Sequence, residues 1–235
     1  MIKFDVMILS EASALGLSVS EPALAAFGKY CDLLLEANSR INLTAVKEPD
    51  EIAVRHFADS LALLACCDLT SSRVIDIGSG AGFPGLPIRI CAPSMELTML
   101  DSLAKRVDFL ARVCRELDIP AECVHARAEE AARLPSRRDS YDAAVSRAVA
   151  RLGELCELCM PFVKPGGVFL AMKAADADAE LAEAENAVRL LGGKTERVFY
   201  YTVGGIKRSI IIIRKISATP AAYPRRYAKI QKEPL

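Results

Sequence analysis

The sequence predicts an α/β protein of the doubly wound, Rossmann-like class, built on a seven-stranded and mostly parallel sheet. From Arg73 onward, short β-rich runs alternate with amphipathic helices, and the first run ends in a glycine-rich turn at residues 78–85. The last two β-rich runs, 196–203 and 208–215, are too close in sequence for a parallel crossover. They predict an antiparallel hairpin at one edge of the sheet.

Residues 1–68 predict a helical subdomain that packs on this sheet. Their apolar residues recur at helix-like spacing, and glycine is rare among them. Pro22 and Pro49 stand where helices are expected to start, a position at which the missing N–H of proline is harmless. The apolar positions are Leu24, Phe27, Leu33, Leu34, Leu35, Ile52, Val54, Phe57, Leu61 and Leu64.

Residues 69–216 predict the core that carries the sheet, and residues 217–235 a basic tail. Alternating strands and helices imply parallel strands joined by right-handed crossovers. Before the hairpin, the expected strands are 73–78, 95–101, 122–126, 141–147 and 166–173. The expected helices of this core are 85–91, 103–117, 128–133, 151–160 and 176–191.

The composition is that of a globular protein without a membrane span. Of 235 residues, 52% are hydrophobic and 26% charged, and apolar runs such as residues 210–213 are far too short to cross a bilayer. The N-terminus has no secretory pattern, so we expect a cytoplasmic protein. The eight cysteines are expected to be reduced, and with only two histidines beside them we expect no metal site.

The formal net charge is zero, but the charges are unevenly distributed along the chain. From Lys207 to the C-terminus there are eight basic residues and one acidic residue, a net charge of +7. A basic end on an acidic body indicates an anionic partner, of which nucleic acid is the commonest. Charge alone leaves a solvated tail open as the alternative.

The glycine-rich turn does not match the motifs that hold phosphates. In a dinucleotide fingerprint, G-x-G-x-x-G, the third glycine position counted from Gly78 is Phe83. Counted from Gly80 the third glycine is Gly85, but prolines then remove N–H groups from the first turn of the helix. A P-loop is excluded because Leu and Pro stand where Lys and Ser or Thr are needed.

Two aspartates at strand ends predict the chemistry of the ligand. We expect Asp76, two residues before the turn, to point into the cleft, where it would repel a pyrophosphate and attract an ammonium group. Asp101 ends the second strand and is placed to accept hydrogen bonds from both ribose hydroxyls. A ribose, a cationic group and no phosphate describe S-adenosylmethionine, the predicted cofactor. The alternative is structural, with Asp76 capping the loop and Asp101 capping the next helix.

The end of the fourth strand indicates which atom receives the methyl group. Residues 145–153 lack the Asn or Asp followed by Pro-Pro-aromatic that serves exocyclic amines, and neither the fourth nor the fifth strand ends in a nucleophilic Cys. No general base for an oxygen acceptor is evident. What remains is an acceptor with its own lone pair, such as a ring nitrogen, which the protein has to position and shield from water. Guanine N7 fits this description.

With these features, the chain closely resembles the ribosomal RNA small subunit methyltransferase G family, also called the glucose-inhibited division protein B family. The resemblance implies a Rossmann-like class I methyltransferase that acts on N7 of one guanosine in the decoding-region loop of bacterial 16S rRNA. The tail departs from it, with RRYAKIQ at residues 225–231 where the family often has a more Gly/Pro-rich stretch. The matching segments are 42–61, 76–88, 100–110, 125–130, 146–150, 164–167 and 219–235.

The resemblance also implies which residues contact the cofactor and the acceptor. Arg147, after the fourth strand, lies between donor and acceptor, and we hypothesise that it orients the base or a phosphate; an ion pair with Asp76 or another acid is the alternative. Asp76 and Gly80 are also predicted to bind the cofactor, but on the sequence pattern alone and not on the resemblance. The implied cofactor contacts are Gly78, Phe83, Asp101, Ser102, Leu103, Ala128, Glu129 and Arg147.

The expected partner is 16S rRNA or the small ribosomal subunit, with no membrane and no obligate protein partner. The basic residues predicted to contact RNA are Arg225, Arg226, Lys229 and Lys173. Two alternatives remain: a methyltransferase of the same fold acting on a small molecule, and a nicotinamide-dependent oxidoreductase. Phe83 and Pro84 disfavour the second, because they disrupt the dinucleotide fingerprint.

Overall fold

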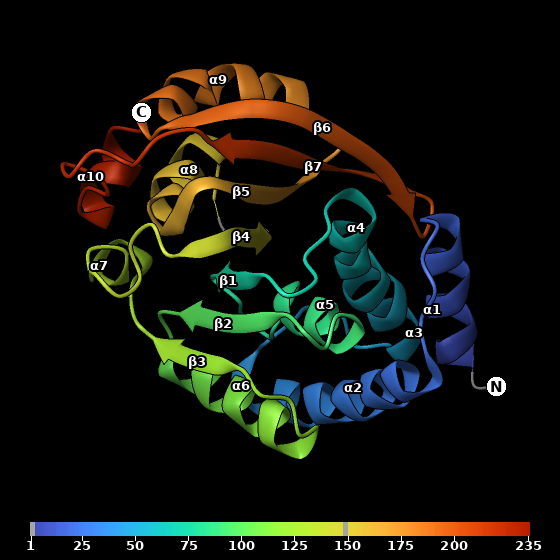
Figure 1. Cartoon of the computed structure of the whole chain (residues 1–235). Helices are drawn as coiled ribbons and strands as arrows, with labels where there is room; N and C mark the ends of the chain where they lie inside the picture. Colours follow the sequence, from blue (N-terminus) through green and yellow to red (C-terminus); the bar gives the residue numbers. More distant parts are fainter. Residues whose placement is uncertain (1–2, 148–149) are drawn as a thin grey trace.

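The computed structural model describes residues 3–147 and 150–235, and it has the predicted doubly wound α/β fold (Figure 1). Its strands are β1 Arg73–Ile77, β2 Glu96–Asp101, β3 Glu122–His125, β4 Tyr141–Arg147, β5 Val163–Ala174, β6 Gly193–Val203 and β7 Ile206–Lys215. They form one seven-stranded sheet in the order β3-β2-β1-β4-β5-β7-β6. Strands β1 to β5 pair in parallel, and β7 lies antiparallel between β5 and β6.

The C-terminal hairpin is longer and its turn tighter than the sequence pattern predicts. Val203 pairs with Ile206, so the turn consists of Gly204 and Gly205 alone, and β6 begins at Gly193. Both turn glycines have positive φ, 55° and 73°, the conformation required by the two-residue turn that matches the twist of paired strands. The hairpin itself is confirmed at the sheet edge.

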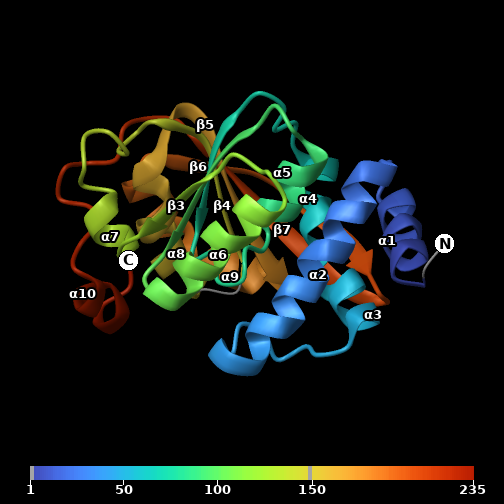
Figure 2. The ribbon, with the colours of Figure 1, turned by 90° about the horizontal axis from the view of Figure 1, so that it is seen from below.

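Two layers of helices cover the sheet, one on each face (Figure 2). One layer holds α5 Gly85–Cys91, α6 Ala104–Glu116 and the N-terminal helices, and the other holds α7 Ala128–Ala131, α8 Leu152–Cys159, α9 Ala177–Leu190 and α10 Tyr227–Lys232. The isoleucine run of β7 shows the division, because Ile210 and Ile212 join the first core while Ile211 and Ile213 join the second. This alternation follows from the two-residue period of a strand.

The N-terminal helices share a continuous apolar core with the sheet. They are α1 Lys3–Ala14, α2 Glu21–Ile41, α3 Pro49–Ile52, the π-helical turn η1 Ala53–Ala58 and α4 Asp59–Cys66. At their centre, Phe57 packs against Phe4, Phe27 and Tyr30 with ring centroids 4.8 to 5.7 Å apart. Phe57 also meets Phe83 of the glycine-rich turn edge-on at 5.3 Å. These helices therefore support the turn directly.

The C-terminal segment that follows β7 is folded against the rest of the chain. Ile230 of α10 is fully buried in the core of the α8 layer, and Thr219 is buried as well. Among the described residues, no helix combines the length and the apolar character needed to cross a membrane. Within the matching segment 146–150, Ala148 and Val149 lie outside the described residues.

Truncating the central aromatic ring tests the importance of the N-terminal packing. Phe57→Ala is expected to lower the free energy of unfolding by about 3–5 kcal/mol, because a fully buried ring leaves a cavity that neighbours cannot fill. Val6→Ala, at a side chain that is 44% exposed, is the control and should change it by about 0.5 kcal/mol or less. Urea unfolding followed by circular dichroism measures both. Equal effects of the two substitutions would contradict the assignment.

Candidate active site

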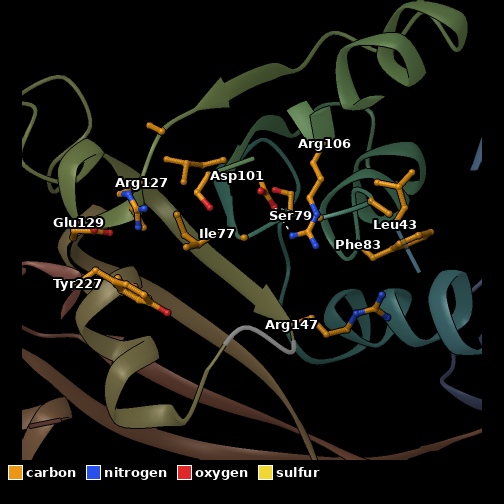
Figure 3. A pocket seen from close by; sticks show the side chains of 18 of the residues that line it. Leu43, Ile77, Ser79, Phe83, Asp101, Arg106, Arg127, Glu129, Arg147 and Tyr227 are labelled. Atoms are coloured by element: carbon orange, nitrogen blue, oxygen red, sulfur yellow. Dashed lines mark hydrogen bonds and ion pairs between the residues drawn. The ribbon is translucent and has the colours of Figure 1, made fainter. Parts of the chain in front are cut away.

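A cavity of about 410 Å³ lies at the carboxyl ends of β1, β2 and β4 (Figure 3). This is the place where the strand order reverses, since β1 pairs with β2 on one side and with β4 on the other. The turn after β1 leads to α5 on one face, and the chain after β4 leads to α8 on the opposite face. The crevice between these two connections is where open α/β sheets bind ligands.

Most of the predicted cofactor residues line this cavity. From the first turn and the second strand they are Gly78, Gly80, Phe83, Asp101 and Ser102. From the first turn of α7 they are Ala128 and Glu129, and from the end of β4 Arg147. Within the described part of the chain, Asp76 and Leu103 fall outside the lining, and the side chain of Leu103 is 52% exposed at the surface. Cofactor binding by these ten residues stays a prediction.

The glycine-rich turn bonds its own N–H groups within the protein. The N–H of Gly78 donates to the carbonyl of Leu100 at 2.8 Å, and that of Gly82 donates to the carbonyl of Ser79 at 2.7 Å. The Gly80 N–H donates to a carboxylate, Asp101 Oδ2, at 2.9 Å. A phosphate-binding loop needs free N–H groups directed at the ligand. The geometry thus gives a physical reason why this turn does not suit a pyrophosphate.

Asp76 lies beneath the turn and not in the cleft, which corrects the expected direction of its side chain. It is fully buried, and its Oδ2 accepts the Gly85 N–H at 2.9 Å. A Cβ at Gly85 would stand 2.7 Å from the same oxygen, so only glycine allows this approach. Oδ1 has no hydrogen-bond partner, and burial raises the pKa of the carboxyl to about 7. The loop-capping alternative is the one that the geometry supports.

Asp101 has the capping role that the sequence left open, and its binding to a ribose stays a prediction. Its Oδ1 accepts the N–H of Leu103, the residue before α6, at 2.9 Å, while Oδ2 accepts the N–H of Gly80. Arg106 lies 3.5 Å from Oδ2 and also lines the cavity. The carboxylate therefore ties the turn after β1 to the loop after β2. Because a carboxylate oxygen can accept more than one hydrogen bond, it retains capacity for a ligand hydroxyl.

Arg147, at the end of β4, is held by an acid from the N-terminal helices. Its guanidinium donates to Asp59 Oδ2 at 2.9 Å and to the Arg55 carbonyl at 3.1 Å, and lies 5.3 Å from the centre of the Phe83 ring. The predicted ion pair with an acid thus exists, but the partner is Asp59 and not Asp76. The pair fixes the guanidinium at the cavity wall.

Asp59 is itself part of a buried network that reaches the sheet edge. Its other oxygen, Oδ1, accepts the Tyr201 hydroxyl of β6 at 2.8 Å and lies 4.0 Å from Arg208 of β7. The side chain is only 5% exposed. A carboxylate that is hydrogen-bonded to β4 and β6 and forms an ion pair with β7 holds these three strands in one arrangement. No pattern in the sequence singles out this residue.

His56 is a cavity residue to which the sequence assigned no definite role. Its ring stacks on Phe83 with centroids 4.8 Å apart, and its Nε2 lies 2.7 Å from Thr44 Oγ1. Nδ1 lies 3.3 Å from a guanidinium nitrogen of Arg147. Burial, together with that nearby guanidinium, lowers the pKa of the imidazole to about 4. The ring is therefore neutral at pH 7.

The four predicted RNA contacts divide into two pairs. Arg225 forms a bidentate pair with the fully buried Glu157, and Lys173 donates to Glu180 at 2.8 Å and to the Ala150 carbonyl. Both side chains thus have structural partners within the protein. Arg226 and Lys229 are exposed. RNA binding by any of the four stays a prediction, and the exposed pair is better placed for it.

Removing the acid behind Arg147 is expected to destabilise the whole chain. Asp59→Ala should lower the free energy of unfolding by about 3–5 kcal/mol, since it leaves Arg147 partly buried without its counter-charge. The control is Asp50→Ala, which removes a solvent-exposed pair with Lys3 and should cost about 1 kcal/mol or less. Denaturant unfolding of both variants measures the difference, and a loss below 1 kcal/mol for Asp59→Ala would contradict the role of the network.

The buried carboxyl of Asp76 predicts a pH dependence of stability. With its pKa raised from 3.8 to about 7, the folded protein holds a proton that the unfolded chain releases within this window. The free energy of unfolding contributed by this group therefore falls as pH rises through the window, by up to about 1.4 kcal/mol per pH unit, and is constant above it.

Asp76→Asn keeps an acceptor for the Gly85 N–H but cannot ionise. Its stability relative to the unsubstituted protein is expected to increase between pH 5 and pH 7 and then to level off, as measured by urea unfolding at several pH values. Glu48→Gln, at an exposed position, is the control and should leave the pH profile unchanged. A difference that does not vary with pH would show that Asp76 ionises normally.

Comparisons with known proteins agree with this geometry. Residues 23–211 match the model of the family described as rRNA small subunit methyltransferase G. Ribosomal RNA small subunit methyltransferase G of Desulfitobacterium hafniense is 44% identical over 94% of this chain and 93% of the relative. The protein of the same name from Acetivibrio thermocellus is 40% identical over 100% of this chain and 98% of the relative.

A solved structure with the same fold is that of M. jannaschii TYW2 in complex with AdoMet, with a TM-score of 0.51 and 12% identity. The alignment covers 63% of this chain and 71% of TYW2, which shows likeness of fold alone. The family match and the full-length relatives identify the enzyme class as methyltransferase, which overturns the oxidoreductase alternative. The chain belongs to the rRNA small subunit methyltransferase G family.

Proposed function

We propose that this chain transfers a methyl group from S-adenosylmethionine to N7 of a specific guanosine in the decoding-region loop of bacterial 16S rRNA. Family membership supports methyl transfer to small-subunit rRNA. In the structure, the proposal depends on one observation: a carboxylate that lines the cavity, Asp101, faces a glycine turn whose N–H groups are bonded within the protein. Such a site favours a ribose and a cation over a pyrophosphate.

The residues that line the cavity fit this cofactor. A volume of about 410 Å³ is in the range of small-molecule sites. Apolar side chains of Ile77, Leu100 and Leu158 line the cavity and suit the flat faces of an adenine, and Asp101 offers carboxylate oxygens to ribose hydroxyls. The charge that a sulfonium and an ammonium group would meet is that of Asp101, the acid that lines the cavity beside the turn.

The proposed reaction requires the protein to position the guanine against the methyl group, and it does not require acid–base catalysis. When bound, the cofactor supplies a methyl group on a positively charged sulfur, and guanine N7 accepts it through an in-plane lone pair without losing a proton. His56 does not have to act as a base, and both its ring nitrogens already have polar neighbours. Arg147, fixed by Asp59 at the cavity wall, is the residue we assign to orienting the base or its phosphate.

The basic tail supports an RNA partner. Arg226 and Lys229 are exposed beside the cofactor cavity, which Tyr227 lines from the same segment. Cations next to aromatic rings are typical of single-stranded RNA contacts. The substrate in this proposal is 16S rRNA or the small ribosomal subunit, the enzyme works in the cytoplasm, and it needs no obligate protein partner.

Methyl transfer to a defined base tests the proposal. Labelled S-adenosylmethionine is incubated with the protein and with 16S rRNA or small subunits from a strain that lacks the gene, and the labelled nucleoside is identified by mass spectrometry. The expected product is 7-methylguanosine at one position. Label on an adenine or a pyrimidine would refute the ring-nitrogen assignment, and no label on either substrate would refute the proposal.

The same assay includes a variant of the cofactor site. Asp101→Ala should raise the Kd for S-adenosylmethionine by about 10-fold or more, because hydrogen bonds to a charged group contribute roughly 1.5–3 kcal/mol, and methyl transfer should fall with it. Glu96→Ala removes an exposed acid at the other end of the same strand, β2, and is the matched control. Unchanged affinity in Asp101→Ala would remove that residue from the site.

A further inference from the structure

The C-terminal segment, residues 217–235, crosses the helix layer that borders one end of the cavity. Two arginines that follow α7 hold it by its backbone. Arg138 donates to the carbonyls of Thr219 at 2.7 Å and Tyr223 at 2.9 Å, and Arg133 donates to that of Pro224. Figures 1 and 2 both place α10 beside α7. Residues 219–224 are thus held against the rest of the chain by their backbone.

A buried ion pair then fixes the start of α10. Glu157 of α8 has no exposed surface, and its carboxylate accepts the Arg225 backbone N–H at 2.7 Å and the Arg225 guanidinium at 2.6 to 3.1 Å. Ile230, one turn further along, is fully buried in the core beneath the helix. The helix α10 is thus held on one side by the bidentate contact of Arg225 and on the other by the buried Ile230, and these two contacts fix its position.

This arrangement places an aromatic ring of the tail in the cofactor cavity. Tyr227, the first residue of α10, lines it together with Ala128, Glu129 and Leu158. In Figure 3 the Tyr227 side chain and Glu129 lie at one end of the cavity, while Phe83 and Arg147 lie at the other. The tyrosine hydroxyl accepts a hydrogen bond from Gln231, one turn along α10, at 3.2 Å. This bond lies at the surface, so the ring takes its position from the two anchors of α10, Arg225 and Ile230.

We propose that Tyr227 forms one wall of the adenine end of the cofactor site, so that the basic tail is part of the S-adenosylmethionine pocket. An aromatic ring beside apolar side chains is suited to stack on a flat purine. This inference rests on the proposed function, which supplies the cofactor. It also means that deleting residues 219–235 removes a cofactor contact together with the RNA-facing cations, so such a deletion does not separate an RNA acceptor from a small molecule.

Calorimetry tests whether Tyr227 contacts the cofactor. It measures binding of S-adenosylhomocysteine to the full chain without RNA. Tyr227→Ala should raise the Kd about 5- to 100-fold, the range expected when one base–aromatic stack is lost. Tyr227→Phe keeps the ring and should stay within about twofold of the unsubstituted protein, as should the matched control Lys232→Ala on the exposed side of α10. An unchanged Kd in Tyr227→Ala would overturn the inference.

A spectroscopic measurement makes the test independent of affinity. The chain has no tryptophan, so Tyr227→Trp introduces one fluorophore at the proposed wall. S-adenosylhomocysteine should quench or shift its emission, whereas a fluorophore placed by Lys232→Trp should not respond. If both emissions stay constant while calorimetry detects binding, the wall assignment is wrong. If the unsubstituted protein itself fails to bind the compound, the proposed function fails instead.

Discussion

The structure depends on one constraint: the turn between β1 and α5 must keep a single shape while its backbone is enclosed. Three acceptors outside the turn bind its N–H groups, namely the carboxylates of Asp76 and Asp101 and the carbonyl of Leu100. On the outer side, the Tyr30 hydroxyl donates to the Ala81 carbonyl. A Cβ at Gly82 would collide with that hydroxyl. The turn therefore depends on glycine and on partners from two strands and one N-terminal helix.

The N-terminal helices act as a support for the catalytic end of the sheet. Phe57 and Tyr30 pack against Phe83 from behind, and the Tyr30 and Phe83 rings stack with centroids 5.3 Å apart. The same layer supplies Asp59 to Arg147. Both the glycine-rich turn and Arg147 thus take their positions from residues 1–68, which makes separate folding of a core without these helices physically unfavourable.

The fold was largely predictable because its signals are local. Alternating strands and helices, a glycine turn and two β-rich runs with a short connection dictate a doubly wound sheet with a terminal hairpin. The loop positions of the site followed as well, since Gly78, Asp101 and Ala128 stand at strand ends that must meet at one edge. The position of a residue at a strand end does not determine where its side chain points. For this reason the expected direction of the Asp76 side chain, into the cleft, was wrong.

Sequence patterns did not predict the contacts between side chains that lie far apart in the chain. Asp59 meets Tyr201 across 142 residues of sequence, and it does so from the end of a π-helical turn that periodicity does not reveal. In the tail, net charge indicated a nucleic-acid partner, yet charge carries no information on whether a given arginine is free or buried against an acid. Arg225 is of the second kind, because its guanidinium pairs with the fully buried carboxylate of Glu157 on α8.

The basic tail thereby has an inward face and an exposed face, and its residues alternate between the two along the sequence. Arg225 points inward to Glu157, Arg226 is exposed, Tyr227 turns back to the cavity, and Lys229 is exposed again. This alternation is what a short helix requires when one side must pack and the other must stay solvated. A cation placed on the inward side without an acid would be left buried and unpaired, and an apolar residue on the outward side would add no attraction for a phosphate backbone. The tail thus keeps Arg226 and Lys229 exposed, while the buried Glu157 fixes the position of the inward Arg225.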